Sequence, residues 1–156
     1  MKTKILIVGG TGFIGYHLAY KCVQRGWDVT SVSSNPPKKL RFIKKIKYVV
    51  CDITNKNLLN KKINKYFDYV INLGGYVDHS DKKKTYNSHF LGCKNLADIF
   101  LKKKTKVFVQ MGSSIEYGFN KSPHIENMIC NVKKLNSIYG KAKLSATNYL
   151  LDLYKK

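Results

Sequence analysis

Apolar and polar positions divide the chain into two alternating kinds of segment. Short runs rich in β-branched residues, typical of strands, occur at residues 4–8, 29–33, 47–50, 69–73 and 106–111. Longer segments with a helical period occur at residues 12–25, 57–65, 82–103 and 137–154. Strands that alternate with helices favour a parallel sheet covered on both faces. The pattern therefore predicts a doubly wound α/β fold, with one domain over residues 1–156.

Residues 113–134 form the one long stretch without a clear period, and this stretch contains Pro123. Long irregular connections in compact domains often cover a ligand site. We therefore expect this segment to be a loop over a ligand crevice.

Four glycines lie directly after the first predicted strand, in the sequence Gly9-Gly10-Thr11-Gly12-Phe13-Ile14-Gly15. Glycine permits a tight turn and lets the backbone approach a phosphate, whose charge the free N–H groups of the following helix attract. Because this turn joins a buried strand to a helix, it predicts a Rossmann-type site for the pyrophosphate of NAD or NADP. The candidate contacts here are Gly9, Thr11, Gly12, Phe13, Ile14 and Gly15.

The end of the second strand bears on the choice of dinucleotide, because an acidic residue there would hold the ribose 2′-OH of NAD. Asp28 lies at the beginning of that strand instead, and its end carries Ser33 and Ser34. Lys38 and Arg41 follow, and hydroxyls together with cations suit a 2′-phosphate better than a bare ribose. We expect NADP as the preferred cofactor, with Ser33 and Lys38 among its contacts, and NAD as the alternative.

Further segments follow the glycine turn in a recognisable order: Cys51-Asp52-Ile53, Asn72-Leu73-Gly74-Gly75, Met111-Gly112-Ser113-Ser114-Ile115-Glu116-Tyr117-Gly118 and Tyr139-Gly140-Lys141-Ala142-Lys143. Together they resemble the motifs of the extended short-chain dehydrogenases/reductases, a family of epimerases, dehydratases and ketoreductases of nucleotide sugars. The resemblance spans nearly the whole chain. It implies that Asp52 contacts the adenine with Ile53 beside it, and that Leu73, Gly74 and Gly75 lie along the cofactor.

The last two segments supply the candidate catalytic residues. A phenol with a pKa of about 10 is a weak base at neutral pH, but a lysine four residues later lies on the same helix face and favours the phenolate. The resemblance implies that Tyr139 is the acid/base and that Lys143 tunes it, both in contact with the cofactor. It also implies that Ser113 orients the substrate oxygen.

The residues after Ser113 bear on the type of reaction. Sugar 4,6-dehydratases of this family carry an acid/base pair there, whereas this chain has Ser114 and Ile115. Isoleucine cannot transfer a proton, and Glu116 lies one position late, where a strand-like segment would turn it to the other face. We therefore expect an NAD(P)-dependent epimerase or 4-ketoreductase that acts on a nucleotide-activated sugar.

Two departures from the family pattern leave alternatives open. His89 stands where relatives carry an asparagine, and the chain ends at Lys156, where relatives continue into a C-terminal substrate domain. With that domain absent, the chain could be a truncated fragment that binds the dinucleotide without catalysis. A redox-sensing regulator is a third hypothesis, against which Tyr139 and Lys143 count, because such proteins commonly lack both.

The net charge of +20 raises nucleic acid as a partner. Only Arg25 and Arg41 are arginines, however, so the bidentate groups that read bases are scarce, and we expect no nucleic-acid binding. Short apolar runs and scattered cysteines predict a cytoplasmic protein without a membrane span or metal site. The resemblance implies a homodimer formed through the helices near residues 82–103 and 137–154.

Overall fold

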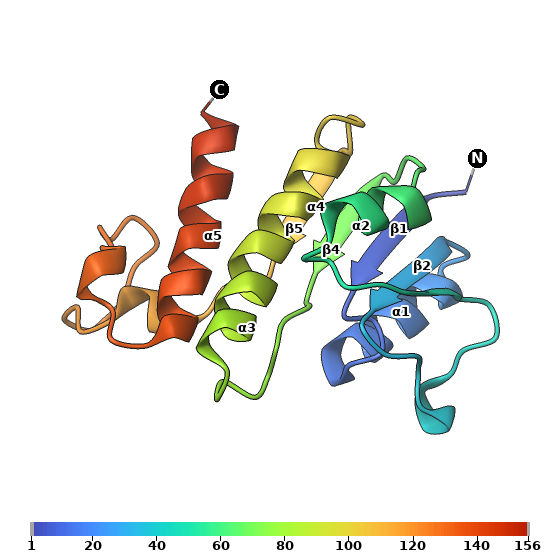
Figure 1. Cartoon of the computed structure of the whole chain (residues 1–156). Coiled ribbons are helices and arrows are strands. Elements are labelled where there is room, and N and C mark those ends of the chain that lie inside the picture. The colour runs from blue at the N-terminus through green and yellow to red at the C-terminus, as the bar shows by residue number, and fades with distance from the viewer. Residues whose placement is uncertain (1, 156) are drawn as a thin grey trace.

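The computed structural model describes residues 2–155 and contains a parallel sheet of five strands in the order β3-β2-β1-β4-β5 (Figure 1). The strands are β1 (Lys4–Val8), β2 (Asp28–Ser33), β3 (Lys47–Val50), β4 (Tyr69–Asn72) and β5 (Val107–Gln110). This arrangement confirms the predicted doubly wound, Rossmann-type fold. The order reverses between β1 and β4, and ligands of such sheets bind at this switch point, at the carboxyl ends of the strands.

The helices cover both faces of the sheet. They are α1 (Phe13–Gln24), α2 (Lys56–Lys62), α3 (Lys82–Tyr86), α4 (Gly92–Phe100) and α5 (Ile138–Tyr154). Ile5 and Ile7 of β1 pack in one core cluster with Ala19 of α1. Leu6 and Val8, which point to the opposite face, pack in a second cluster with residues of α2 and α4. Burial on both faces explains why β1 is an unbroken apolar run.

The single helix expected at residues 82–103 has three parts. A π-helical turn over Asn87–Leu91 joins α3 to α4, and the backbone stays right-handed helical at Tyr86, Leu91 and Gly92. The helical period at residues 82–103 was therefore predicted correctly, but the π-helical turn inside this segment was not. π-Turns inside helices are frequent at functional sites, because they re-aim side chains.

The segment at residues 113–134 is mostly irregular, as predicted, but it also holds two short 3₁₀ helices. These are η3 (Ser114–Tyr117) and η4 (Val132–Lys134), and a third, η1 (Lys39–Arg41), follows β2. Helices α4 and α5 run side by side, with this segment beyond α5 (Figure 1). Among residues 2–155, no helix is long and apolar enough to cross a membrane.

Candidate functional site

The glycine turn forms a tight backbone cradle after β1. Gly9 has a φ of +79°, which side-chain-bearing residues rarely adopt, and its carbonyl oxygen accepts a hydrogen bond from the Gly12 N–H at 2.9 Å. A Cβ at Gly15 would lie 2.2 Å from the Gly9 oxygen, so no side chain fits there without moving the turn. The tight turn that the sequence predicted is therefore present.

Helix α1 begins at this turn and leaves its first N–H groups free for a ligand. Its N-cap is Gly12, which has no side chain to cap the helix, and the first turn carries no acidic residue. Phe13 and Ile14 are exposed at 69% and 57%, although both are large and apolar. A helix N-terminus of this kind attracts an anionic group.

Two residues contact Thr11 of the glycine turn: Ser33 at the end of β2 and Arg41 in η1. The Thr11 N–H donates to the Ser33 hydroxyl at 3.4 Å, and the Arg41 guanidinium donates to the Thr11 carbonyl at 3.3 Å. Tyr48 holds the η1 loop in place, because its hydroxyl accepts from the Ile43 N–H. Lys38 lies in the same loop with its side chain exposed.

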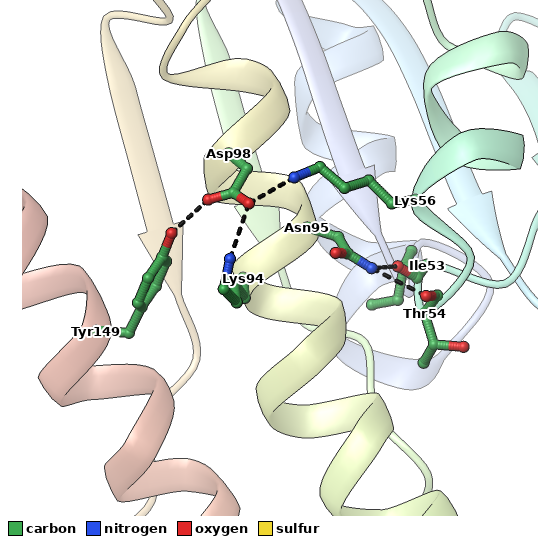
Figure 2. A network of polar contacts seen from close by, with 7 residues as sticks. All are labelled: Ile53, Thr54, Lys56, Lys94, Asn95, Asp98 and Tyr149. Carbon is green, nitrogen blue, oxygen red and sulfur yellow. Dashed lines mark hydrogen bonds and ion pairs between the residues drawn. The ribbon is translucent and has the colours of Figure 1, made fainter.

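The segment after β3 turns toward α4. The Asp52 carboxylate accepts a hydrogen bond from the Thr54 N–H at 2.9 Å, and Ile53 is buried against Gly92. Figure 2 shows the Asn95 amide of α4 donating to the carbonyls of Ile53 and Thr54, each at 3.0 Å. Helix α4 thus fixes the backbone that carries the predicted adenine contacts.

The predicted Leu73-Gly74-Gly75 segment extends from β4 along the switch point. The Gly74 N–H donates to the side chain of the buried Asn72, and a Cβ at Gly9 would lie 3.0 Å from the Leu73 carbonyl group. A Cβ at Gly75 would lie 2.0 Å from the imidazole of His89. The ends of β1 and β4 therefore approach each other closely.

Ser113 begins η3 and forms a reciprocal cap with Glu116. The Ser113 hydroxyl accepts from the Ile115 N–H at 3.5 Å, and the Ser113 N–H donates to the Glu116 carboxylate at 2.7 Å. Glu116 also accepts from the Thr147 hydroxyl of α5 at 2.6 Å. The expectation of a strand-like segment was wrong: the 3₁₀ turn buries Glu116 as a structural acceptor.

Tyr139 and Lys143 lie one helical turn apart at the start of α5. Lys143 is only 4% exposed, its ammonium group donates to the Met111 carbonyl at 2.7 Å, and it lies 5.7 Å from the centre of the Tyr139 ring. Burial lowers the pKa of Lys143, and the Glu116 carboxylate partly opposes this. Because Met111 directly precedes Gly112 and Ser113, this bond links α5 to the end of β5.

His89, in the π-helical turn, lies between these groups. Its Nε2 is 3.2 Å from the Tyr76 carbonyl, and its Nδ1 is buried without a hydrogen-bond partner. Burial and the nearby Lys143 charge lower the pKa of His89 to about 4. The imidazole is therefore neutral at neutral pH, and Nε2 carries the proton that is donated to Tyr76.

A polar network behind the site ties α2, α4 and α5 together (Figure 2). Asp98 of α4 accepts from Lys56 at 2.6 Å, from Lys94 at 3.0 Å and from the Tyr149 hydroxyl of α5. Burial would raise the pKa of Asp98, but the three donors outweigh it and hold the pKa well below its usual range. The same carboxylate and burial raise the pKa of Tyr149 to about 12.

Sequence reasoning missed two features of this site. The Ser113–Glu116 pair has the spacing of a capping box, which was readable from the sequence. His79 stacks on Tyr139 with ring centres 4.4 Å apart, and no local pattern indicates this contact between a loop and a distant helix.

In the described part of the chain, no group of three or more histidine, cysteine, aspartate or glutamate residues could hold a metal ion. The four cysteines are free; Cys22, Cys51 and Cys93 are buried, and burial raises the pKa of Cys93 to about 12.

Comparison with known proteins identifies the class. The family model of the NAD dependent epimerase/dehydratase family matches residues 5–156, and the chain belongs to this family. The chain is 31% identical over 134 residues to the UDP-N-acetyl-alpha-D-glucosaminuronate decarboxylase of Bacillus cytotoxicus, covering 81% of this chain and 41% of that protein. It is 27% identical over 170 residues to bifunctional UDP-glucose 4-epimerase and UDP-xylose 4-epimerase 1 of Pisum sativum, covering 97% of this chain and 48% of that protein.

Solved structures agree with the fold. The UDP-glucose 4-epimerase of Thermotoga maritima, solved with UDP-glucose, superposes with a TM-score of 0.86 at 23% identity, covering 97% of this chain and 51% of that one. The Bordetella bronchiseptica enzyme WbmH, solved with NAD⁺, gives a TM-score of 0.86 at 23% identity, with 97% and 52% covered. The chain thus spans about half the length of the relatives it matches.

Proposed function

We propose that this chain is one NAD(P)-binding domain that carries the acid/base site of a nucleotide-sugar epimerase or 4-ketoreductase. The observation that supports this best is the convergence of four segments at the carboxyl end of the sheet. The glycine turn, the Leu73–Gly75 segment, Ser113 and the start of α5 meet there, joined by the bond from Lys143 to Met111.

The residues at this edge fit a dinucleotide. The backbone cradle at Gly9 and Gly15 leaves no room for a side chain, and the uncapped start of α1 offers N–H groups to a pyrophosphate. Thr11, Gly12, Phe13 and Ile14 would hold that group. Asp52 and Ile53 would contact the adenine, and Leu73, Gly74 and Gly75 would lie along the cofactor.

The bound dinucleotide would supply a carbon that accepts or donates hydride. Tyr139 would take the proton from the sugar hydroxyl at its phenolic oxygen, or return it, and the cationic Lys143 would favour the phenolate form. Lys143 is suited to this because it is buried and held at Met111, so its charge is poorly screened by water. Ser113 would orient the sugar oxygen, since its own side chain makes only a long bond to Ile115.

Tyr139→Phe tests this acid/base role. The variant keeps the ring but loses the proton-transfer group, so exchange of hydride with a nucleotide sugar should fall by at least about 10²-fold while dinucleotide binding stays saturable. Tyr154→Phe is the matched control, because Tyr154 is 89% exposed at the far end of the same helix. Unchanged activity in Tyr139→Phe would remove Tyr139 from the mechanism.

We also infer a preference for NADP, supported by the position of Arg41. Its guanidinium reaches the Thr11 carbonyl beside Ser33, where the ribose of the adenosine half would lie, and Lys38 is exposed in the same loop. Arg41→Ala should weaken binding of NADPH at least about tenfold and leave that of NADH nearly unchanged. Equal affinities for the two cofactors in the unmodified chain would contradict the preference.

Binding without turnover is the second candidate, supported by the share of its relatives that the chain covers. A chain that spans about half of a relative's length need not hold the whole sugar site. Saturable dinucleotide binding without hydride exchange would favour this candidate.

The remaining partners follow from the family. We propose a homodimer through the helices near residues 82–103 and 137–154, a nucleotide sugar as substrate, a cytoplasmic location and no nucleic-acid partner. Arginine is scarce among the chain's 29 basic residues, which supports the last of these.

A further inference from the structure

We propose that His79 and His89 are positioning residues that orient the ring of Tyr139 from two adjacent sides. This inference rests on the proposed acid/base role of Tyr139 for its catalytic meaning. The three rings come from three distant parts of the chain: the loop after β4, the π-helical turn and the start of α5. We call them the ring clamp.

The two histidines contact Tyr139 on adjacent sides, because their own ring centres lie 6.1 Å apart. The His79 ring stacks on Tyr139 with centres 4.4 Å apart and planes 19° from parallel. The His89 ring meets Tyr139 nearly at a right angle, at 75°, with centres 4.8 Å apart. Stacked and edge-to-face pairs are both favourable geometries for aromatic rings. Together they restrain both the tilt and the rotation of the phenol.

His89 is the fixed side of the ring clamp. Its ring is 6% exposed, packs against Gly75 and is tied through Nε2 to the Tyr76 carbonyl at 3.2 Å. Leaving its buried Nδ1 without a partner costs folding free energy. A glutamine would keep the donor to Tyr76 without a ring, and a phenylalanine would keep the ring without the donor. Histidine supplies both, and this gives a physical reason to tolerate the unpaired nitrogen.

His79 is the exposed member of the ring clamp, and hydrogen bonds within its own loop hold that loop in place. Asp78 accepts hydrogen bonds from the Ser80 N–H and the Tyr76 hydroxyl, both at 3.1 Å. The Tyr76 N–H donates to Ser88, which lies beside His89 in the π-helical turn. The loop that carries His79 is therefore anchored to the same turn that carries His89.

The position of a phenolic oxygen depends on the orientation of its ring, and a displacement of about 1 Å at a catalytic group can cost about 10²-fold in rate. The ring clamp fixes this orientation before any ligand binds. It is independent of the YxxxK spacing, which sets only where the backbone of Tyr139 lies.

NMR spectra of the whole chain, with tyrosine rings labelled, test the ring clamp directly. The chain has 11 tyrosines, and the signals that vanish in Tyr139→Phe identify the ring in question. In the unmodified chain, stacking on His79 should move the Tyr139 ring protons upfield of those of the exposed Tyr154. His79→Ala should remove most of this shift, and His79→Phe should restore it.

His89→Gln gives the second, independent variant. Its amide N–H reaches as far as Nε2 and keeps a donor for the Tyr76 carbonyl, so the loop stays tied, but it removes the ring beside Tyr139. The Tyr139 signals should move while the backbone amide signals of Gly75 and Tyr76 stay close to their positions. Tyr139 signals that are unchanged in both His79→Ala and His89→Gln would overturn the inference.

Hydride exchange connects the ring clamp to catalysis. His79→Ala should lower kcat roughly tenfold without changing the dinucleotide KM, and His79→Phe should recover most of the rate. If the Tyr139 signals move as expected while kcat stays unchanged, the positioning role is overturned. If the unmodified chain exchanges no hydride but its Tyr139 signals respond as expected, the acid/base proposal fails and the ring clamp stands.

Discussion

The two halves of the site consist of different groups, backbone in one half and side chains in the other. The half at β1 and α1 consists of backbone: a left-handed glycine, a carbonyl that accepts from Gly12, and uncapped N–H groups. The half at β5 and α5 consists of side chains: Ser113, Glu116, Tyr139 and Lys143, held by contacts between distant segments. The backbone cradle depends on the absence of a Cβ at its glycines. The side-chain half depends on the residues that pack around each of its functional side chains.

This difference predicts how each half responds to substitution. The backbone half should tolerate almost no added atom, because the Gly9 oxygen lies 2.2 Å from the Cβ position of Gly15. The side-chain half should lose function in steps, because each of its groups has its own partners and can be removed alone.

Gly15→Val should produce the largest effect. The added side chain meets backbone rather than a flexible side chain, so the turn must open and saturable dinucleotide binding should be lost, together with at least about 2 kcal/mol of stability. Isothermal titration and urea unfolding measure the two effects.

Gly26→Ala is the control for that prediction. Unlike Gly15, Gly26 has a positive φ, at +75°, and a Cβ there meets nothing within 4 Å. Strain alone should cost about 1 kcal/mol and leave dinucleotide affinity unchanged. If Gly15→Val still binds the dinucleotide at the original affinity, the close contact between Gly15 and the Gly9 carbonyl oxygen is not required for binding.

The contrast also explains what the sequence could predict. The glycine turn, the apolar run of β1 and the helix at Ile138–Tyr154 depend on local patterns, and all were predicted within a residue or two. The π-helical turn and the stacking of His79 on Tyr139 depend on packing between segments about 60 residues apart, which no local period encodes. The role of Glu116 lies between these cases, because its capping spacing is local but its bond to Thr147 is not.

Glu116→Ala should have the next largest effect. The substitution leaves the Ser113 N–H and the Thr147 hydroxyl without their acceptor, which should lower the free energy of unfolding by about 2–3 kcal/mol. Dinucleotide affinity should change little, because the cradle at β1 is untouched. Urea unfolding and NADPH titration on the same sample separate the two halves.

Glu126→Gln is the matched control for Glu116→Ala. Glu126 is an exposed carboxylate in the neighbouring loop, and its replacement should change stability by less than about 0.5 kcal/mol. A large loss of cofactor affinity in Glu116→Ala would break the proposed independence of the two halves.

Asp98→Asn should give the smallest effect and shows how the halves are joined. Asp98 links Lys56, near the predicted adenine contacts, to Tyr149 of α5, and the amide would weaken these bonds by about 1 kcal/mol in total at pH 7. The folded chain holds the pKa of Asp98 well below the unfolded value of about 3.9. The stabilisation is therefore complete above that value and is lost as the pH falls below it.

The difference in unfolding free energy between the unmodified chain and Asp98→Asn should shrink from pH 7 to pH 3, whereas the exposed Asp152→Asn should show no such change. A difference that does not depend on pH would mean that the packing of the residue, and not its charge, joins α2 to α5.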